Sequence, residues 1–457
     1  MTESSPALDQ EPSRYPLSFT QEWFLTMDQG EDGGTFSPRF MTVGALRVSG
    51  HVDLTVLQGA LDDVVARHEL LRTLVVRDAD PPHQVVYPPC QVPLEVTDLT
   101  PVTGKSRDLI VQERLVEAEG GTISTREVPL MRALLYRFDD RDSALLLTVH
   151  HSVSDGWSVG VILRDLGAFY EARVSGTAPK LPEMRQYREY VEWQRASAAS
   201  TDDDGALRYW ADKLDGAREF VMPTDHGHPQ RYSQPYSLHV FSIDADTMAA
   251  AAALAKATRG TLFVVVLSAI YILANQITGA TDLTVDAVTS GRNELAFHNT
   301  MGLFLNVLPF RTEIADCTSF RDVVLKTRET FIDAMANELP AGLLEQTFPD
   351  YIRSREDPRM AQFLISDTSS QDGEMILPIA EGAKGLDERL LQDAETHDLP
   401  GGGTVWYLSM EPDGPLSGGM QFNRDEFEQS TVQGWSAGLK QILASAVRDP
   451  DLDWRQP

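Results

Sequence analysis

The sequence predicts a mixed α/β protein built from two lobes. At 457 residues the chain exceeds the roughly 250–300 residues at which a single hydrophobic core stops growing. Short, β-branched apolar runs alternate with stretches whose apolar residues recur every three or four positions, as expected for sheets covered by helices. Small residues and three consecutive aspartates at 196–205 interrupt this pattern and predict a linker. We therefore expect lobes at 15–195 and 205–457.

Strands and helices alternate through the first lobe. A helix is expected at 16–27 because Ser18 can cap it, and a second at 54–68 because Asp53 precedes it. Residues 67–76 lead from this second helix into a strand. Further strands are predicted at 40–48, 84–87, 129–138 and 143–151, with helices at 110–119 and from Trp157 onward.

The second lobe repeats the alternation. The apolar stretch 261–276 reads as a fully buried helix, and 371–403 is polar and rich in glycine, which predicts loops. The remaining expected strands are 237–243, 283–288, 303–311 and 416–422, and the remaining helices are 249–258, 320–337 and 433–447.

Composition excludes several classes of partner. The formal net charge of −29 disfavours nucleic acid and anionic membrane surfaces, both of which would repel the chain. Cys90 and Cys317 form no metal-binding or disulfide pattern. The polar N-terminus is no signal peptide, and the longest apolar run, 262–273, is too short to span a bilayer. We expect a cytoplasmic protein with no nucleic-acid or membrane partner.

One stretch, ALLLTVHHSVSDGWSVG at 144–160, combines a strand, a polar loop and the start of a helix. His150 and His151 stand where the strand ends. Adjacent side chains on a strand point to opposite faces, so the two histidines are expected to have different roles. One should face a cavity and the other should be tied into the structure.

Several motifs resemble the condensation-domain superfamily of nonribosomal peptide synthesis. HHSVSDGWS at 150–158 matches its HHxxxDGxS signature. RHELLRT (67–73), YREYVEW (187–193) and GLFLNVLPFR (302–311) resemble other family motifs in the same order, and 18–25 and 355–363 do so loosely. The resemblance implies two chloramphenicol acetyltransferase-like lobes, each a mixed sheet with helices, arranged as a V around a central tunnel. It also implies a free-standing condensation enzyme, of which enediyne antibiotic pathways contain one group.

The resemblance also implies a chemistry. An aminoacyl or acyl group would pass from a thioester on a carrier protein's 4'-phosphopantetheine arm to the alcohol or amine of a small molecule, giving an ester or an amide. His151 would act as the base or positioning group, which suits the ordinary histidine pKa of about 6.5. His150 would be structural. Asp155 would pair with an arginine, for which Arg292 and Arg72 are the candidates.

Four further residues are candidates around this motif. Gly156 would permit a positive φ or close approach of the backbone, and its N–H lies where a helix N-terminus favours an oxyanion. Trp157 and Ser158 could line the donor channel, and Asn306 could contact substrate or make a structural hydrogen bond. No metal or bound cofactor is expected, because His226, His228, His239, His298 and His397 lack metal-ligand spacing and read as surface or loop residues.

Two alternatives stay open. GWSVG at 156–160 formally fits G-x-S-x-G, so Ser158 could be the nucleophile of a serine esterase. The chain could also be a non-catalytic, condensation-like domain that recruits partner proteins. The second histidine and the acidic-glycine pair, both present here, count against recruitment.

Overall fold

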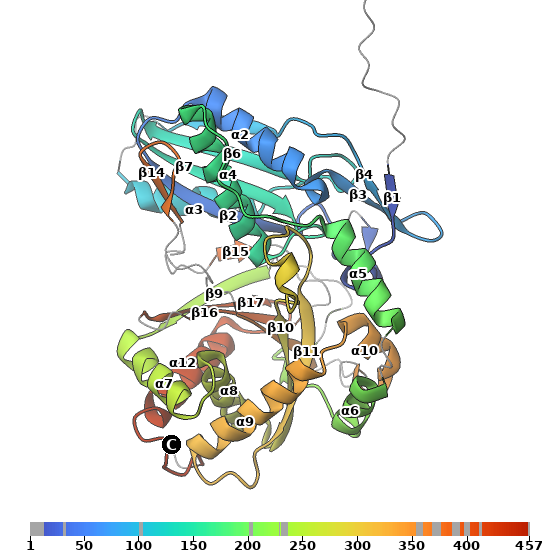
Figure 1. Cartoon of the computed structure of the whole chain (residues 1–457). Helices are drawn as coiled ribbons and strands as arrows, with labels where there is room; N and C mark the ends of the chain where they lie inside the picture. The colour runs from blue at the N-terminus through green and yellow to red at the C-terminus, as the bar shows by residue number, and fades with distance from the viewer. Residues whose placement is uncertain are drawn as a thin grey trace, which may run out of the picture. The chain divides into compact units, whose positions relative to one another are not determined.

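The computed structural model describes residues 13–30, 33–99, 104–200, 204–227, 229, 236–352, 360–367, 376–385, 394–396, 403–410 and 414–455. Residues 1–12, most of the segment at 355–363 and much of 371–403 lie outside these residues. The chain divides into two compact units (Figure 1). Unit 1 comprises Met1–Ser200, Arg292–Phe304 and Met375–Asp387, and unit 2 contains the rest.

Unit 1 is organised around a six-stranded sheet in the order β13-β14-β2-β7-β6-β5. Strand β7 (Asp142–His150) lies in the middle, antiparallel to both β2 (Met41–Ser49) and β6 (Met131–Asp139), and is buried along nearly its whole length. This position explains its continuous apolar run, because a central strand is covered on both faces. The edge strand β5 (Leu94–Asp98) is parallel to β6 and mostly exposed.

Helices cover the two faces of this sheet. Helix α3 (Arg107–Glu119) packs against Ala45, Ala144 and Leu146. Helix α4 (Gly156–Ser175) lies over the opposite face, where a Cβ on Gly44 would come within 2.5 Å of Val159. The close approach of α4 to β2 therefore requires a glycine at 44. Helix α2 (Leu54–Arg67) packs beside α4.

The remaining elements of unit 1 surround this core. A small sheet has the order β1-β4-β3 (Ser13–Tyr15, His83–Val86, Thr73–Val76), and the 3₁₀ turn η2 (Glu69–Arg72) leads directly into β3. Helix α1 (Phe19–Thr26) begins with a capping box between Ser18 and Gln21, and α5 spans Tyr187–Ser200.

Two segments from the second half of the chain belong to unit 1. One, Arg292–Phe304, contains the 3₁₀ turn η3 (Leu295–Phe297). The other contributes β13 (Ile376–Leu377) and β14 (Gly382–Gly385), and β14 extends the sheet along β2. The sequence interpretation assigned both segments to the second lobe, because nothing in their composition indicates that the chain returns to the first.

Unit 2 holds a second mixed sheet. Its order is β11-β10-β12-β16-β17-β9-β15, and β8 pairs with β12. The strands are β8 (Val221–Pro223), β9 (Tyr236–Ile243), β10 (Asp282–Thr289), β11 (Asn306–Glu313), β12 (Met360–Asp367), β15 (Ala394–Thr396), β16 (Thr404–Met410) and β17 (Leu416–Asn423). The helices are α6 (Asp204–Leu214), α7 (Ala245–Ala257), α8 (Leu262–Thr278), α9 (Phe320–Ala336), α10 (Ala341–Thr347), α11 (Pro349–Ile352) and α12 (Gln429–Ala446).

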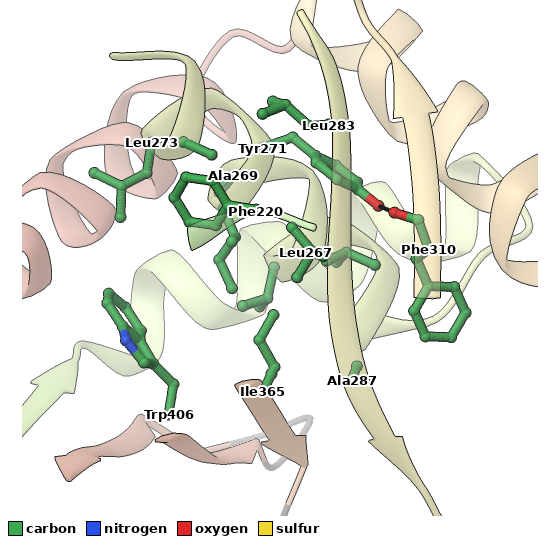
Figure 2. Packing of buried hydrophobic residues seen from close by; sticks show 14 of the residues in the cluster. Phe220, Leu267, Ala269, Tyr271, Leu273, Leu283, Ala287, Phe310, Ile365 and Trp406 are labelled. Carbon is green, nitrogen blue, oxygen red and sulfur yellow. Dashed lines mark hydrogen bonds between the residues drawn. The ribbon is translucent and has the colours of Figure 1, made fainter. Parts of the chain in front are cut away.

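Helix α8 is the centre of the unit 2 core, as its uniformly apolar sequence predicts. Its residues 264–274 are all buried. Figure 2 shows Tyr271 of α8 beside Leu283 and Phe310, with its hydroxyl directed to the Phe310 carbonyl at 2.5 Å. The phenol is thus satisfied inside an otherwise apolar cluster.

Most predicted elements are confirmed, and two regions differ. The expected linker at 196–205 is largely helical, since α5 continues to Ser200 and α6 begins at Asp204. The expected loops at 371–403 include β13, β14 and β15. In the described part of the chain no single helix is long and apolar enough to cross a membrane, and only the bent pair α7 and α8 passes that test together, with a bend of 106°.

Candidate active site

The two histidines lie at the end of β7, as predicted. The strand ends at His150, which is paired with Met41 of β2. One residue further, the His151 N–H donates to the carbonyl of Phe40 at 2.8 Å. Five residues, 151–155, then connect the strand to α4. The pleat therefore directs the two imidazoles into different surroundings.

His150 is fully buried, and both of its ring nitrogens are hydrogen-bonded. The Ser152 N–H donates to Nδ1 at 3.1 Å, so Nδ1 is the acceptor and Nε2 carries the proton, which it donates to the Ser37 carbonyl at 2.9 Å. Burial lowers the pKa of His150 to about 4. A neutral imidazole with both nitrogens engaged can hold the loop but cannot take a proton from a substrate.

His151 is half-buried and keeps one nitrogen unengaged. Its Nδ1 lies 2.7 Å from the Ser154 carbonyl, which can only accept, so Nδ1 carries the proton and Nε2 has the free lone pair. Among the described residues, none donates a hydrogen bond to Nε2. Burial lowers the pKa of His151, and this shift is opposed by a hydrogen bond to the residue's own backbone, by the Asp155 carboxylate and by the hydrogen bond to Ser154. At neutral pH the ring is therefore an uncharged acceptor able to receive a proton.

Asp155 is nearly buried, and its carboxylate does not hydrogen-bond to either histidine. As the N-cap of α4 it accepts the Ser158 N–H at 2.8 Å through Oδ1 and the Phe304 N–H at 3.0 Å through Oδ2. The Arg292 guanidinium adds an ion pair, with Nη2 lying 3.2 Å from Oδ1. Asp155 thus ties the start of α4 to the segment Arg292–Phe304.

Of the two arginine candidates for Asp155, the structure selects Arg292 and excludes Arg72. Arg292 also donates from Nη1 to the carbonyls of Phe297 and Thr300 at 3.0 and 2.8 Å. Arg72 instead donates to the carbonyls of Val65, Ala66 and Tyr87 in its own part of the chain. The motif that contains Arg72 lies at the η2 turn, where a guanidinium satisfies carbonyl groups left by helix α2.

Ser158 and Trp157 both form hydrogen bonds within unit 1. Ser158 is fully buried. Its Oγ accepts the Gly302 N–H at 2.9 Å and Arg292 Nη2 at 3.0 Å, and its single proton is shared between Asp155 Oδ1 and the Gly302 carbonyl, each 2.7 Å away. The Trp157 indole N–H donates to the His298 carbonyl at 2.9 Å. The Ser158 hydroxyl therefore has no capacity left for a donor, and the donor-channel prediction for the half-buried Trp157 stays a prediction.

Gly156 opens α4 without the positive φ that the sequence interpretation allowed. It is exposed, and a Cβ added to it would meet nothing within 4 Å. The glycine therefore leaves open space at a helix N-terminus, where unpaired N–H groups favour a developing negative charge.

Asn306 belongs to unit 2 and makes structural hydrogen bonds. Its Nδ2 donates to Glu338 Oε1 and to the Leu339 carbonyl, both at 2.9 Å, and its Oδ1 accepts the Ala341 N–H at 2.8 Å. Both amide protons and the carbonyl are therefore used to fix the start of α10. Of the two roles open from the sequence, this geometry supports the structural one.

The five histidines expected to be surface or loop residues divide into three groups. His226 is exposed, as expected. His239 is instead buried and 3.0 Å from Ser436 Oγ, and His298 is half-buried against Trp157, with Nε2 2.8 Å from the Arg292 carbonyl. His228 and His397 lie outside the described residues. Within the part of the chain that the structure describes, no group of three or more His, Cys, Asp or Glu side chains could hold a metal ion.

Sequence reasoning missed three contributors to the His151 environment, two aromatic rings and one backbone carbonyl. Phe40 stacks on the imidazole with ring centroids 4.7 Å apart, and Phe24 of α1 meets it edge-on at 6.1 Å. Registering the strand at 40–48 against that at 143–151 would have placed Phe40 opposite His151. The Ser154 carbonyl carries no sequence signal, because any residue at that position supplies the same group.

These features define a class: a chloramphenicol acetyltransferase-like α/β fold with the HHxxxDG motif at the junction of β7 and α4. The family model of the condensation domain matches residues 11–357. The chain belongs to the condensation-domain family.

Curated relatives include a nonribosomal peptide synthase much longer than this chain. The chain is 30% identical over 440 residues to chondramide synthase cmdD of Chondromyces crocatus, covering 95% of this chain and 11% of that protein. It is also 30% identical over 465 residues to a dimodular nonribosomal peptide synthase of Bacillus subtilis, covering 98% of this chain and 19% of that protein. The chain thus spans a small fraction of the length of these relatives.

Solved structures include a neighbour of matching length. SgcC5 from Streptomyces globisporus, in complex with (R)-(-)-1-(2-naphthyl)-1,2-ethanediol and sucrose, superimposes with a TM-score of 0.88 at 33% identity, covering 96% of this chain and 100% of that one. The X-domain from teicoplanin biosynthesis superimposes with a TM-score of 0.75 at 24% identity, covering 98% and 99% of the two chains, and shows the shared fold alone.

Proposed function

We propose that this protein transfers an acyl or aminoacyl group from a carrier-protein thioester to the hydroxyl or amine of a small molecule. The observation that supports the proposal most directly is the state of His151. Its Nδ1–H is fixed by the Ser154 carbonyl, which leaves Nε2 as a neutral acceptor at the end of β7. The family's relation to nonribosomal peptide synthesis supports the carrier-bound donor.

In the proposed reaction His151 serves as a general base. Nε2 takes the proton of the acceptor O–H or N–H as the heteroatom attacks the thioester carbonyl carbon. The negative charge that develops on the carbonyl oxygen is stabilised at the N-terminus of α4, beside the open space at Gly156. When the tetrahedral species collapses, the carbon–sulfur bond breaks and the imidazolium returns its proton to the pantetheine thiolate.

A hydroxyl acceptor has specific support. The structure of SgcC5 holds a 1,2-diol, so 1,2-diols are the first acceptors to test, with primary amines as the competing class. Ester and amide formation need the same proton transfer to Nε2 and differ only in the attacking atom.

The esterase alternative is less well supported. A serine nucleophile needs a base within hydrogen-bond reach of its hydroxyl. Ser158 is instead buried, its oxygen already accepts two N–H groups, and the His151 proton is directed to Ser154. A non-catalytic recruitment role would leave the unengaged nitrogen of His151 without a purpose.

The test is to incubate the protein with aminoacyl- and acyl-carrier proteins and a panel of aryl diols and amines, with product formation followed by mass spectrometry. We expect product with wild type and a rate lower by about 10²–10⁴ in His151→Ala, since general-base help is typically of that size. His151→Asn is the matched control, because its amide can still donate to the Ser154 carbonyl but cannot act as a base. Wild-type rates in both variants would reject this function.

A further inference from the structure

The His151 imidazole contacts two aromatic rings, Phe40 and Phe24, which also contact each other with centroids 5.9 Å apart. Phe40 faces it in a nearly parallel stack, with centroids 4.7 Å apart and an interplanar angle of 13°. Phe24 approaches at 6.1 Å and 66°, with an edge-on geometry. Offset stacking and edge-to-face contact are the two favourable arrangements for aromatic pairs. The imidazole is thus held by ring contacts in addition to its bond to Ser154.

The backbone fixes Phe40 in this position. It directly precedes β2, its N–H donates to the Ser37 carbonyl at 2.9 Å, and its own carbonyl accepts the His151 N–H at 2.8 Å. Strands β2 and β7 pair with Met41 opposite His150. This register brings Phe40, just before β2, beside His151, just after β7. Sheet register therefore places the Phe40 backbone beside that of His151, within reach for the two rings to stack.

A phenyl face interacts differently with the two protonation states of an imidazole. The face carries partial negative charge, so it attracts a cation far more than a neutral ring, and the attraction grows when water is excluded. His151 is half-buried. The negative charge of the Asp155 carboxylate also favours the protonated imidazole. Burial acts in the opposite direction by lowering the pKa of His151.

We propose that Phe40 is a positioning residue that stabilises the protonated form of His151 through its ring face and thereby assists proton transfer to Nε2. This inference rests on the function proposed above for His151. Because the imidazole gains its proton as the acceptor attacks, the ring face stabilises the transition state more than the ground state.

The test changes the electron density on the face of the Phe40 ring, and in one variant it removes the ring. Phe40 is replaced by phenylalanine analogues with increasing numbers of ring fluorines, which withdraw electron density from the face, and by Phe40→Leu and Phe40→Tyr. The pKa of His151 is read by NMR titration of its imidazole C–H signals, assigned with His151→Ala. We expect Phe40→Leu to lower this pKa by about half to one pH unit, fluorination to lower it stepwise, and Phe40→Tyr to keep it near wild type.

Turnover gives a second readout. In each variant the acidic limb of the pH profile of kcat/KM should move to lower pH by as much as the pKa of His151 measured by NMR. In Phe40→Leu, kcat should fall about three- to tenfold with KM unchanged. The titration does not require turnover, so an absence of acyl transfer would reject the proposed function without affecting the test of the Phe40 contact.

Phe36→Leu is the matched control. Phe36 is buried in the same segment but lies against the Arg77 guanidinium, 4.9 Å from its ring centroid. Its loss should lower the melting temperature and leave the His151 titration in place. A His151 pKa that is unchanged across the fluorinated series, or that moves as far in Phe36→Leu as in Phe40→Leu, would overturn the proposal.

Discussion

Two groups of polar side chains meet where β7 passes into α4, and they differ in how fully their hydrogen-bonding capacity is used. The Asp155 carboxylate accepts from two backbone N–H groups and from Arg292, and the Ser158 hydroxyl accepts two N–H groups and donates its proton. The His151 ring donates one hydrogen bond, and among the described residues nothing donates to its second nitrogen.

This difference separates the residues that hold the structure, Asp155 and Ser158, from the residue that can react, His151. A polar group whose partners are all internal stabilises the fold and has no capacity left for a substrate. A ring held firmly at one nitrogen and unengaged at the other is oriented and still able to react. The predictions below change Asp155, Ser158 or the neighbouring His150 and ask whether stability or turnover responds.

The largest effect is expected for Asp155→Ala. Removing the carboxylate leaves the buried Arg292 guanidinium without its anionic partner, which typically costs about 3–5 kcal/mol of unfolding free energy. Urea unfolding followed by circular dichroism measures this loss. His151→Ala, at a half-buried ring, should lose much less. Asp155→Ala with wild-type stability but abolished turnover would contradict the scaffold assignment.

A double-mutant cycle sharpens this result. Asp155→Ala and Arg292→Met should be strongly coupled, because each removes the partner of the other. Arg72→Met is the matched control, since Arg72 donates only to carbonyl groups of its own neighbourhood. Its coupling with Asp155→Ala should be within about 0.5 kcal/mol of zero.

The sequence predicted the local features of this junction well. The apolar run of β7 and the helical periodicity after Trp157 are properties of adjacent residues, and both were identified, whereas the cap that Asp155 forms on α4 was not predicted. The cap at Ser18 was found for the same reason. Local hydrogen bonding and side-chain periodicity are encoded within a few residues, so they can be read from one chain.

Contacts between distant segments could not be predicted in the same way. Arg292 and Arg72 have the same side chain, and only the crossing of Arg292–Phe304 into unit 1 brings one of them to Asp155. The strand β14 likewise joins β2 although its glycine-rich sequence predicts a loop. Such pairings depend on the path of the chain, for which the sequence carries no periodic signal.

A smaller effect is expected in how the stability of the protein depends on pH, and it distinguishes His150 from His151. The pKa of His150 is lowered to about 4 in the folded protein, against about 6.5 in the unfolded chain. Between these values the unfolded state binds the proton and the folded state does not, so stability falls as pH decreases from 6.5 to 4 and is unaffected above this window. The full contribution is about 3 kcal/mol.

His150→Gln should remove this contribution while keeping a donor near the Ser37 carbonyl. Midpoints of urea unfolding measured from pH 7 to pH 4 should therefore fall less steeply in the variant than in wild type. Parallel curves for the two proteins would show that His150 is protonated as easily in the folded state as in the unfolded chain.

The smallest effect is expected for Ser158→Ala, and it tests whether the scaffold group is chemically inert. Loss of the hydroxyl leaves the Gly302 N–H and one Arg292 N–H without their acceptor, which costs about 1–3 kcal/mol. Ser268→Ala is the matched control, because the Ser268 hydroxyl only donates to the Val264 carbonyl within α8 and its loss should be nearly neutral. Turnover of Ser158→Ala should stay within a few-fold of wild type, since the oxygen has no free lone pair for a substrate.

Mass spectrometry after incubation with an activated ester should find no acyl group on Ser158 in the wild-type protein. An acylated Ser158, together with lost turnover in the alanine variant, would transfer the chemistry from His151 to the serine.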